Sequence, residues 1–297
     1  MHRKTLLLLV LSLLIVAWTA CSDDDNDDSP GGSSAAVEIK GTDGVTVTLT
    51  EAPKRIVSLA PHATEIICAI DAGGSLAAVD KFANCPAGSK SKPEVDGFTP
   101  SVEAIAALKP DFVYMVFDPG EVAASLRRLD IEVLNLDVPD SLDGVFEHIE
   151  LWGRITRHED DAGDLVGDMR KQRDDVLKSV PSSGGPRYFH ELDPELFTVR
   201  EDTFEGSLYA LLKAENIAKG ADSPYPQLSN EAVVARDPQV IILLDGQTAA
   251  DVRTRPGWEN IAAVRNNKIC VLNPDLLSRP GPNIIDGLES LKECLYG

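Results

Sequence analysis

Apolar and polar positions along residues 37–297 follow two periods, one typical of strands and one typical of helices. Short apolar runs predict a hairpin at 37–50 and strands at 55–59, 76–79, 112–116, 131–136, 187–192, 240–244 and 269–272. Amphipathic stretches between them predict helices at 64–72, 122–129, 141–156, 204–212, 258–264 and 284–295, with Thr64 as the N-cap of the first. Strands that alternate with helices in this way favour an α/β fold with parallel sheets.

The chain contains one phrase twice, at residues 101–114 and again at 229–242. The copies align without a gap, and each consists of a Ser-capped short helix, a Pro that ends the helix and an apolar strand. Glu103 and Glu231 occupy the same place in the first helical turn, where negative charge suits the helix dipole. The long interval between the copies predicts two similar α/β lobes with a ligand cleft between them.

Residues 159–180 are mostly polar, with apolar positions at helical spacing. About 20 helical residues would span roughly 30 Å, enough for one long backbone helix to join the lobes. We therefore expect an N-terminal lobe at 37–157, an interlobe helix at 158–181 and a C-terminal lobe at 182–297.

The N-terminus is typical of a processing signal. The basic residues 2–4 precede an apolar run at 5–18 that is short for a membrane-spanning helix. Thr19-Ala20 before Cys21 resembles a bacterial lipobox, although Trp18 stands where Leu is usual. The sequence thus predicts a signal peptide at 1–21, lipidation of Cys21 and a flexible acidic linker at 22–36. This places the protein outside the cytoplasm, anchored to the outer face of the cytoplasmic membrane. An ordinary secretory signal with an incidental Cys is the alternative.

Charge and motifs narrow the function. A net charge of −20 disfavours nucleic acid as a partner, because phosphate contacts need Lys and Arg patches. The sequence has no nucleophile elbow, P-loop or H-E-x-x-H motif and no metal-ligand spacing, so we do not expect an enzyme. His190 is expected to be structural, and His148 and His158 to lie on helix surfaces.

The four cysteines after Cys21 lie in a compartment that permits disulfides. Cys68 falls in an apolar helix and is expected to be a core thiol. The pairing of Cys85, Cys270 and Cys294 stays open.

Open α/β sheets bind ligands at the carboxyl ends of their strands, so the loops there supply the candidate contacts. Five are aromatic, in a chain with only 5% aromatic residues, and suit a broad apolar ligand: Phe82, Phe98, Phe117, Phe197 and Tyr225. The other candidates are Pro61, His62, Glu191, Gln247 and Arg279. The His62 imidazole could be an axial ligand for the cobalt or iron of a bound chelate. A bond to a backbone group is the alternative for His62.

Several strings along residues 37–297 resemble class III periplasmic binding proteins, the cobalamin, ferric-siderophore and haem carriers of ABC importers. These strings are RIVSLAP at 55–61, ATEI at 63–66, LKPD at 108–111, ENI at 215–217, RPGW at 255–258 and RPGP at 279–282. FHELD at 189–193 and YPQLS at 225–229 resemble the cobalamin-binding branch. Asn283 departs from the Arg of many relatives. Leu212 lies near where some relatives carry a Cys, which leaves Cys294 without its expected partner.

The resemblance implies that Glu103 and Glu231, one from each lobe, dock onto Arg residues of a permease dimer with its ATPase. It also implies a monomeric carrier with no intrinsic cofactor, whose small-molecule ligand is cobalamin or another corrinoid. The alternative is a ferric-siderophore or haem carrier. Anionic siderophores need converging cations, and the cleft loops offer mainly Lys81 and Arg279; haem would want a ligand such as Tyr225 or His62. An extracytoplasmic enzyme or adhesion module on this fold is a remote further alternative.

Overall fold

The chain folds around two parallel β-sheets, one in each half, in a computed structural model that describes residues 36–85, 92–182 and 184–297. The predicted signal peptide, the lipidation site Cys21 and linker residues 22–35 lie outside the described residues.

The first lobe contains a sheet with the strand order β5-β4-β3-β6-β7, in which all neighbours are parallel. Strands β3 and β6 are buried along their whole length, as expected when helices cover both faces of a parallel sheet. An antiparallel hairpin of β1 (Val37–Lys40) and β2 (Thr46–Leu49) precedes the sheet. The strands and helices that follow are β3 (Ile56–Ser58), α1 (Pro61–Ala69), η1 (Gly73–Ser75), β4 (Leu76–Asp80), β5 (Glu94–Val95), α2 (Val102–Ala107), β6 (Phe112–Met115), α3 (Val122–Arg127) and β7 (Glu132–Asn135).

The second lobe repeats this plan with a parallel sheet in the order β11-β10-β8-β9. Its central strand β10 is buried throughout. The elements of this lobe are β8 (Arg187–Glu191), α6 (Phe204–Leu211), β9 (Glu215–Asn216), α7 (Asn230–Arg236), β10 (Val240–Leu243), α8 (Ala249–Arg253), η3 (Trp258–Asn260), α9 (Ala262–Arg265), β11 (Ile269–Val271) and α10 (Pro274–Leu277).

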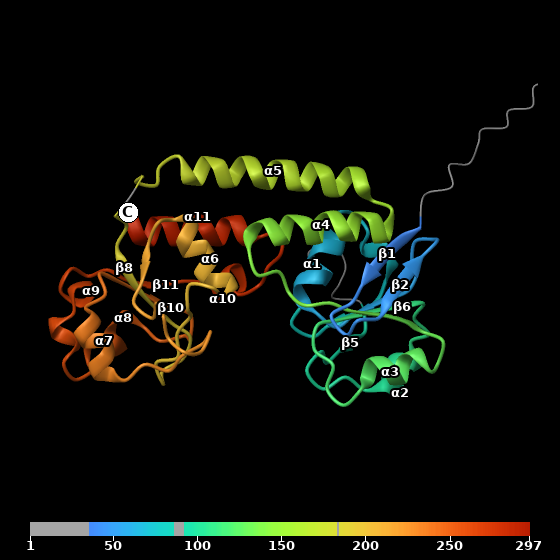
Figure 1. Ribbon diagram of the computed structural model, residues 1–297, viewed down its shortest axis with the longest axis horizontal. Coiled ribbons are helices and arrows are strands. Elements are labelled where there is room, and N and C mark those ends of the chain that lie inside the picture. Colours follow the sequence, from blue (N-terminus) through green and yellow to red (C-terminus); the bar gives the residue numbers. More distant parts are fainter. Residues whose placement is uncertain (1–35, 86–91, 183) are drawn as a thin grey trace, which may run out of the picture. The chain divides into compact units, whose positions relative to one another are not determined.

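Three long helices connect the halves. Helix α5 (Glu159–Leu177) lies along α4 (Leu142–Thr156), which follows the first sheet, and along α11 (Ile284–Tyr296), which closes the second (Figure 1). One apolar face of α5 is buried in the core that these helices share, through Ala162, Val166, Met169 and Val176. The predicted fold class, two α/β lobes joined by a long helix, is therefore confirmed. Among the described residues, no helix combines the length and the apolar character needed to cross a membrane.

Two boundaries differ from the sequence prediction. Helix α1 begins at Pro61 instead of after Thr64. Pro suits the first helical position because it has no backbone N–H that would need a hydrogen-bond acceptor there. The Thr64 hydroxyl is not a cap; it donates to the carbonyl oxygen of Ala60 at 3.2 Å. The helix predicted at 258–264 divides into η3 and α9, because Ile261 between them is extended.

The sequence prediction lacks β5, β9, α8 and α10. Each has between two and five residues, too few for a periodic pattern.

Two disulfides correct the reading of the cysteines. Cys68 is not a core thiol but is bonded to Cys85, which ties α1 to the loop after β4. Cys294 has a partner after all, because Cys270 in β11 is bonded to it. The apolar surroundings of Cys68 suggested a thiol, since sequence spacing does not report which loops fold back onto a helix.

Candidate functional site

A cavity at the carboxyl ends of β3, β4 and β6 has a volume of about 400 Å³. Parallel α/β sheets place their ligand sites at this edge, and the volume lies within the usual range for ligand pockets. The lobe-one lining includes the candidates Pro61, His62, Phe82, Phe98 and Phe117, and residues 274–280 near the end of the chain, including Arg279, close it. The cavity thus brings together six of the ten predicted ligand contacts.

Three exposed aromatic rings form the apolar wall of this cavity. Phe82, Phe98 and Phe117 are 50%, 67% and 56% exposed, unusual values for Phe. Phe82 and Phe98 meet edge to face, with ring centroids 6.4 Å apart. Exposed apolar area at a concave surface is typical of a ligand site.

Asp80, at the end of β4, holds the two loops that carry Phe82 and Phe98. Its carboxylate accepts hydrogen bonds from the amides of Phe82 at 2.8 Å and Gly97 at 3.0 Å. Burial raises the pKa of Asp80, and these two amides oppose that rise. A Cβ at Gly97 would collide with the carbonyl oxygen of Leu59 and lie 2.8 Å from Asp80 Oδ2, so only Gly fits this close approach.

Arg279 is neutralised by two carboxylates at the opposite side of the cavity. Its guanidinium lies 3.0 Å from Glu65 Oε1 and 2.9 Å from Asp275 Oδ1. Glu65 belongs to α1 and is buried, and burial raises its pKa while Arg279 opposes the rise. The other cation predicted near the cleft, Lys81, is likewise paired, at 2.7 Å from Asp96.

His62 lies on the floor of the cavity and is only 3% exposed. Its Nε2 lies 3.2 Å from the Tyr114 hydroxyl, which also lies 3.3 Å from the carbonyl oxygen of Leu136. Burial, and secondarily the nearby His148, lowers the pKa of His62 to about 3, so the ring is neutral at physiological pH. His148, predicted to lie on a helix surface, is half-buried, and its Nδ1 is fully buried. Among the described residues, no group of three or more His, Cys, Asp and Glu is placed to hold a metal ion.

Glu191 and Gln247 lie away from this cavity, at the carboxyl edge of the second sheet. Glu191 is fully buried and receives both arms of the Arg255 guanidinium, with Nη1 at 2.6 Å from Oε2. The Gln247 amide donates to Glu191 Oε1 at 2.8 Å, and its oxygen accepts from Arg255 at 2.9 Å. Arg255 also stacks over the Trp258 ring, 4.4 Å from its centroid.

Phe197 and Tyr225 also lie outside the cavity lining, on two neighbouring extended segments. Phe197 is half-buried and pairs with Gln227 in an isolated bridge. Tyr225 is 48% exposed, and partial burial together with the nearby Glu205 carboxyl raises the pKa of its hydroxyl.

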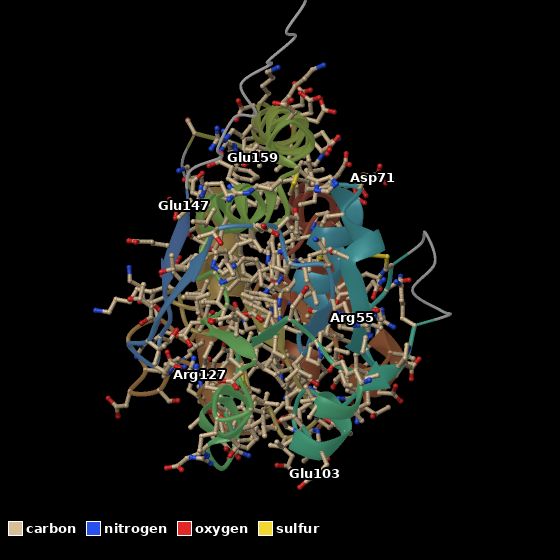
Figure 2. The ribbon with its side chains drawn as sticks, turned by 90° about the vertical axis from the view of Figure 1, so that its right-hand side faces the viewer. Arg55, Asp71, Glu103, Arg127, Glu147 and Glu159 are labelled. Carbon is tan, nitrogen blue, oxygen red and sulfur yellow. A yellow bond between two sulfur atoms is a disulfide. The ribbon has the colours of Figure 1, made fainter. Side chains whose placement is uncertain are left out.

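The two predicted docking acids are both exposed, each in the first turn of a short helix. The Ser caps are as predicted: the side chain of Ser101 accepts from Ala104 N, and that of Ser229 from Ala232 N, both at 3.2 Å. Figure 2 shows Glu103 at the opposite end of the view from Glu159, the first residue of α5.

An arginine at the start of each lobe's first strand holds the other end of these helices. Arg55 donates to the carbonyl oxygens of Leu108 at 2.6 Å and Lys109 at 2.9 Å, and Arg187 donates to that of Asp237 at 2.8 Å. The carbonyls of the residues that directly follow α2 and α7 therefore gain hydrogen-bond donors.

Sequence reasoning missed Asp80 and Arg255 as organisers of the two sheet edges. Both are marked in the sequence, Asp80 by its place at the end of an apolar strand and Arg255 by the RPGW string. Neither signal indicates the partner, because Arg255 and Glu191 are 64 positions apart.

Comparison with known proteins gives a consistent family. A model described as periplasmic binding protein matches residues 56–276. A relative named as an uncharacterized ABC transporter substrate-binding lipoprotein, YvrC, of Bacillus subtilis (strain 168) is 30% identical over 88% of this chain and 85% of its own. The vitamin B12-binding protein of Vibrio cholerae (strain ATCC 39541 / Classical Ogawa 395 / O395) is 30% identical over 82% of this chain and 88% of its own. A possible iron-binding periplasmic solute-binding protein of Staphylococcus epidermidis ATCC 12228 superposes with a TM-score of 0.75 at 27% identity, over 83% of this chain and all of its own.

Two α/β lobes, with a ligand-sized cavity between the edge of the first sheet and residues 274–280, are typical of a solute-binding protein. The chain belongs to the periplasmic binding protein family, whose members serve ABC importers. The family resemblance predicted from the sequence is therefore confirmed.

Proposed function

We propose that this protein binds cobalamin or a related corrinoid in the cavity and delivers it to an ABC permease, from a lipid anchor at Cys21. The main observation in favour of a corrinoid over an anionic chelate is that the arginine of the cavity is already paired with carboxylates. Arg279 faces Glu65 and Asp275, and Lys81 faces Asp96, so these cations offer little unpaired positive charge to an anionic chelate. An apolar aromatic wall with a neutralised cation suits a broad ligand whose polar groups are mostly neutral amides.

The haem alternative is less favoured by the same geometry. His62 is the imidazole nearest the cavity, yet its Nε2 is engaged by Tyr114 and the ring is almost fully buried. Tyr225 lies outside the cavity lining. We therefore assign His62 to the cavity floor and not to axial coordination.

The ligand assignment is tested by isothermal titration of the mature protein with cyanocobalamin, cobinamide, haemin and a ferric hydroxamate. Sub-micromolar binding of the two corrinoids, with weaker binding of the other two, is expected. Tight binding of haemin alone would overturn the corrinoid assignment.

Delivery is assigned to Glu103 and Glu231, which we propose to meet Arg residues of the permease. A charge-assisted Glu–Arg bond in each lobe would orient the carrier as well as hold it. Glu103→Lys combined with Glu231→Lys should abolish uptake and leave corrinoid affinity unchanged. Glu147→Lys, an exposed acid on α4, is the matched control and should transport normally. Loss of ligand binding in the double variant would contradict the docking role.

A further inference from the structure

A single eight-residue segment, 96–103, runs from the cavity wall to the first docking acid. Phe98 lines the cavity, and Glu103 follows it after only four residues. Pro100 restricts the backbone between them, and Ser101 caps α2. The distance between ligand contact and docking acid is therefore set by a short and restrained piece of chain.

Side-chain hydrogen bonds stiffen this segment at its start. The Asp96 carboxylate accepts from the amides of Phe98 at 2.9 Å and Thr99 at 3.1 Å, and its other oxygen binds Lys81 at 2.7 Å. Asp80 holds the Gly97 amide from the opposite side. The Lys81 hydrogen bond, and then the two amides, lower the pKa of Asp96 to about 2, so this acceptor stays ionised at neutral pH.

The far end of the segment touches the docking acid itself. The Ser101 hydroxyl accepts from the Ala104 amide and donates to Glu103 Oε2 at 3.2 Å. One side chain thus caps the helix and orients the carboxylate. Few freely rotating backbone torsions separate Phe98 from Glu103, so a displacement of the backbone at Phe98 also displaces Glu103.

We propose that segment 96–103 reports the occupancy of the cavity to the docking surface, with Asp80 and Asp96 as its positioning residues. This inference rests on the docking role assigned to Glu103 above. A ligand packed on Phe98 fixes this exposed ring and, because the segment is restrained, moves the segment as one unit. Ser101 and Glu103 at its far end are then held in the arrangement that the partner binds, which lowers the ordering cost that the partner would otherwise meet.

The second lobe differs in a way that makes the proposal sharper. Its corresponding segment, 224–229, is held by a backbone ladder, with Thr198 N donating to Pro226 O at 3.0 Å and Arg200 N to Pro224 O at 2.9 Å. The second docking helix is therefore fixed before ligand arrives, and the occupancy signal belongs to the first lobe alone.

Hydrogen exchange of the backbone amides tests this coupling without any ligand. In Asp96→Ala the amides of Ala104 and Ile105 should exchange about tenfold faster, because local opening becomes easier. Asp96→Asn keeps a carbonyl acceptor for Phe98 and Thr99 and should restore slow exchange. The amides of Ala232 and Val233 in α7 should not change in either variant. Equal acceleration in both helices, or none in α2, would overturn the coupling.

A second measurement separates this inference from the docking assignment. Binding to the permease–ATPase complex is compared for wild type, Glu103→Lys and Asp96→Ala, each with and without cyanocobalamin. Weakened binding in both variants, with the ligand-dependent difference lost in Asp96→Ala, supports the proposal. Weakened binding in Glu103→Lys alone overturns the coupling and leaves docking intact. Wild-type binding by both variants removes the docking role and the coupling with it.

Discussion

Gly97 shows how one missing side chain shapes the cavity. The segment that carries Phe98 passes so close to the Leu59 carbonyl that a methyl group has no room there. Gly97→Ala should push this segment outwards and weaken cyanocobalamin binding about tenfold, a loss of roughly 1.4 kcal/mol. Titration calorimetry measures the loss. Gly74→Ala meets nothing within 4 Å and should bind as wild type.

The buried histidines give the protein an acid-sensitive stability. Burial lowers the pKa of His62 and of His190 to about 3, whereas both rings titrate near 6.5 in the unfolded chain. Between these values the unfolded state binds more protons, so stability falls as pH falls. Between pH 7 and pH 5 each ring should lower the free energy of unfolding by roughly 2 kcal/mol.

Urea unfolding at pH 7 and pH 5 checks this dependence. His62→Asn should show a smaller difference between the two pH values than wild type, whatever its absolute stability. An equal difference in variant and wild type would mean that His62 is not the neutral buried group described.

The repeated helices show what the sequence could predict and what it could not. Both Ser caps, both Pro stops and the strands after them follow from residues that are neighbours in the chain. Arg55 and Arg187, which hold the opposite helix ends, act across about 50 positions, and no local pattern marks such a contact. The same limit holds for the cavity. Its loops could be predicted from the sequence, whereas the pairing of Arg279 with Glu65 could not.

Loss of the Ser N-cap should destabilise the protein equally whether the cap belongs to α2 or to α7. Ser101→Ala and Ser229→Ala should each lower the free energy of unfolding by about 1 kcal/mol, because an amide in the first turn loses its acceptor. Urea titration gives the values. Ser290→Ala in α11 removes only a bond to the carbonyl of Asp286 and should change stability by less than about 0.5 kcal/mol. A cap variant as mild as this control would argue against the cap's contribution.

The closing helix depends on a covalent link. Cys270–Cys294 closes a loop of sequence separation 24 and fixes α11 to the second sheet. The paired replacement Cys270→Ser with Cys294→Ser should cost about 3 kcal/mol through the freedom gained by the unfolded chain. Thermal melts with and without reductant would show it: reductant should lower the wild-type melting temperature more than that of the variant.

Contact between the halves of the molecule includes one partly buried ion pair, Glu65–Arg279, which joins residues 214 positions apart. This pair decides both how α1 meets the C-terminal segment and how much positive charge the cavity displays. Glu65→Gln should therefore strengthen haemin binding relative to cyanocobalamin by several-fold, since Arg279 would keep only Asp275 as a partner.

Competition between the two ligands, followed by absorption spectra, measures this preference. Glu147→Gln carries the same change of charge at an exposed residue outside the cavity lining and should leave the ratio unaltered. A ratio that moves equally in both variants would reflect net charge and not the pairing of Arg279.

The repeated cap, acid and arginine make the two lobes near copies at the surface where the partner is proposed to bind. A carrier with two matched acids can meet a partner with two equivalent arginine sites either way round. All of the otherwise backward encounters would then become productive, which doubles the number of productive encounters, a statistical gain of RT ln 2, about 0.4 kcal/mol. The internal duplication thus widens the target for a diffusing carrier, and only the unequal stiffness of the two docking segments would tell one orientation from the other.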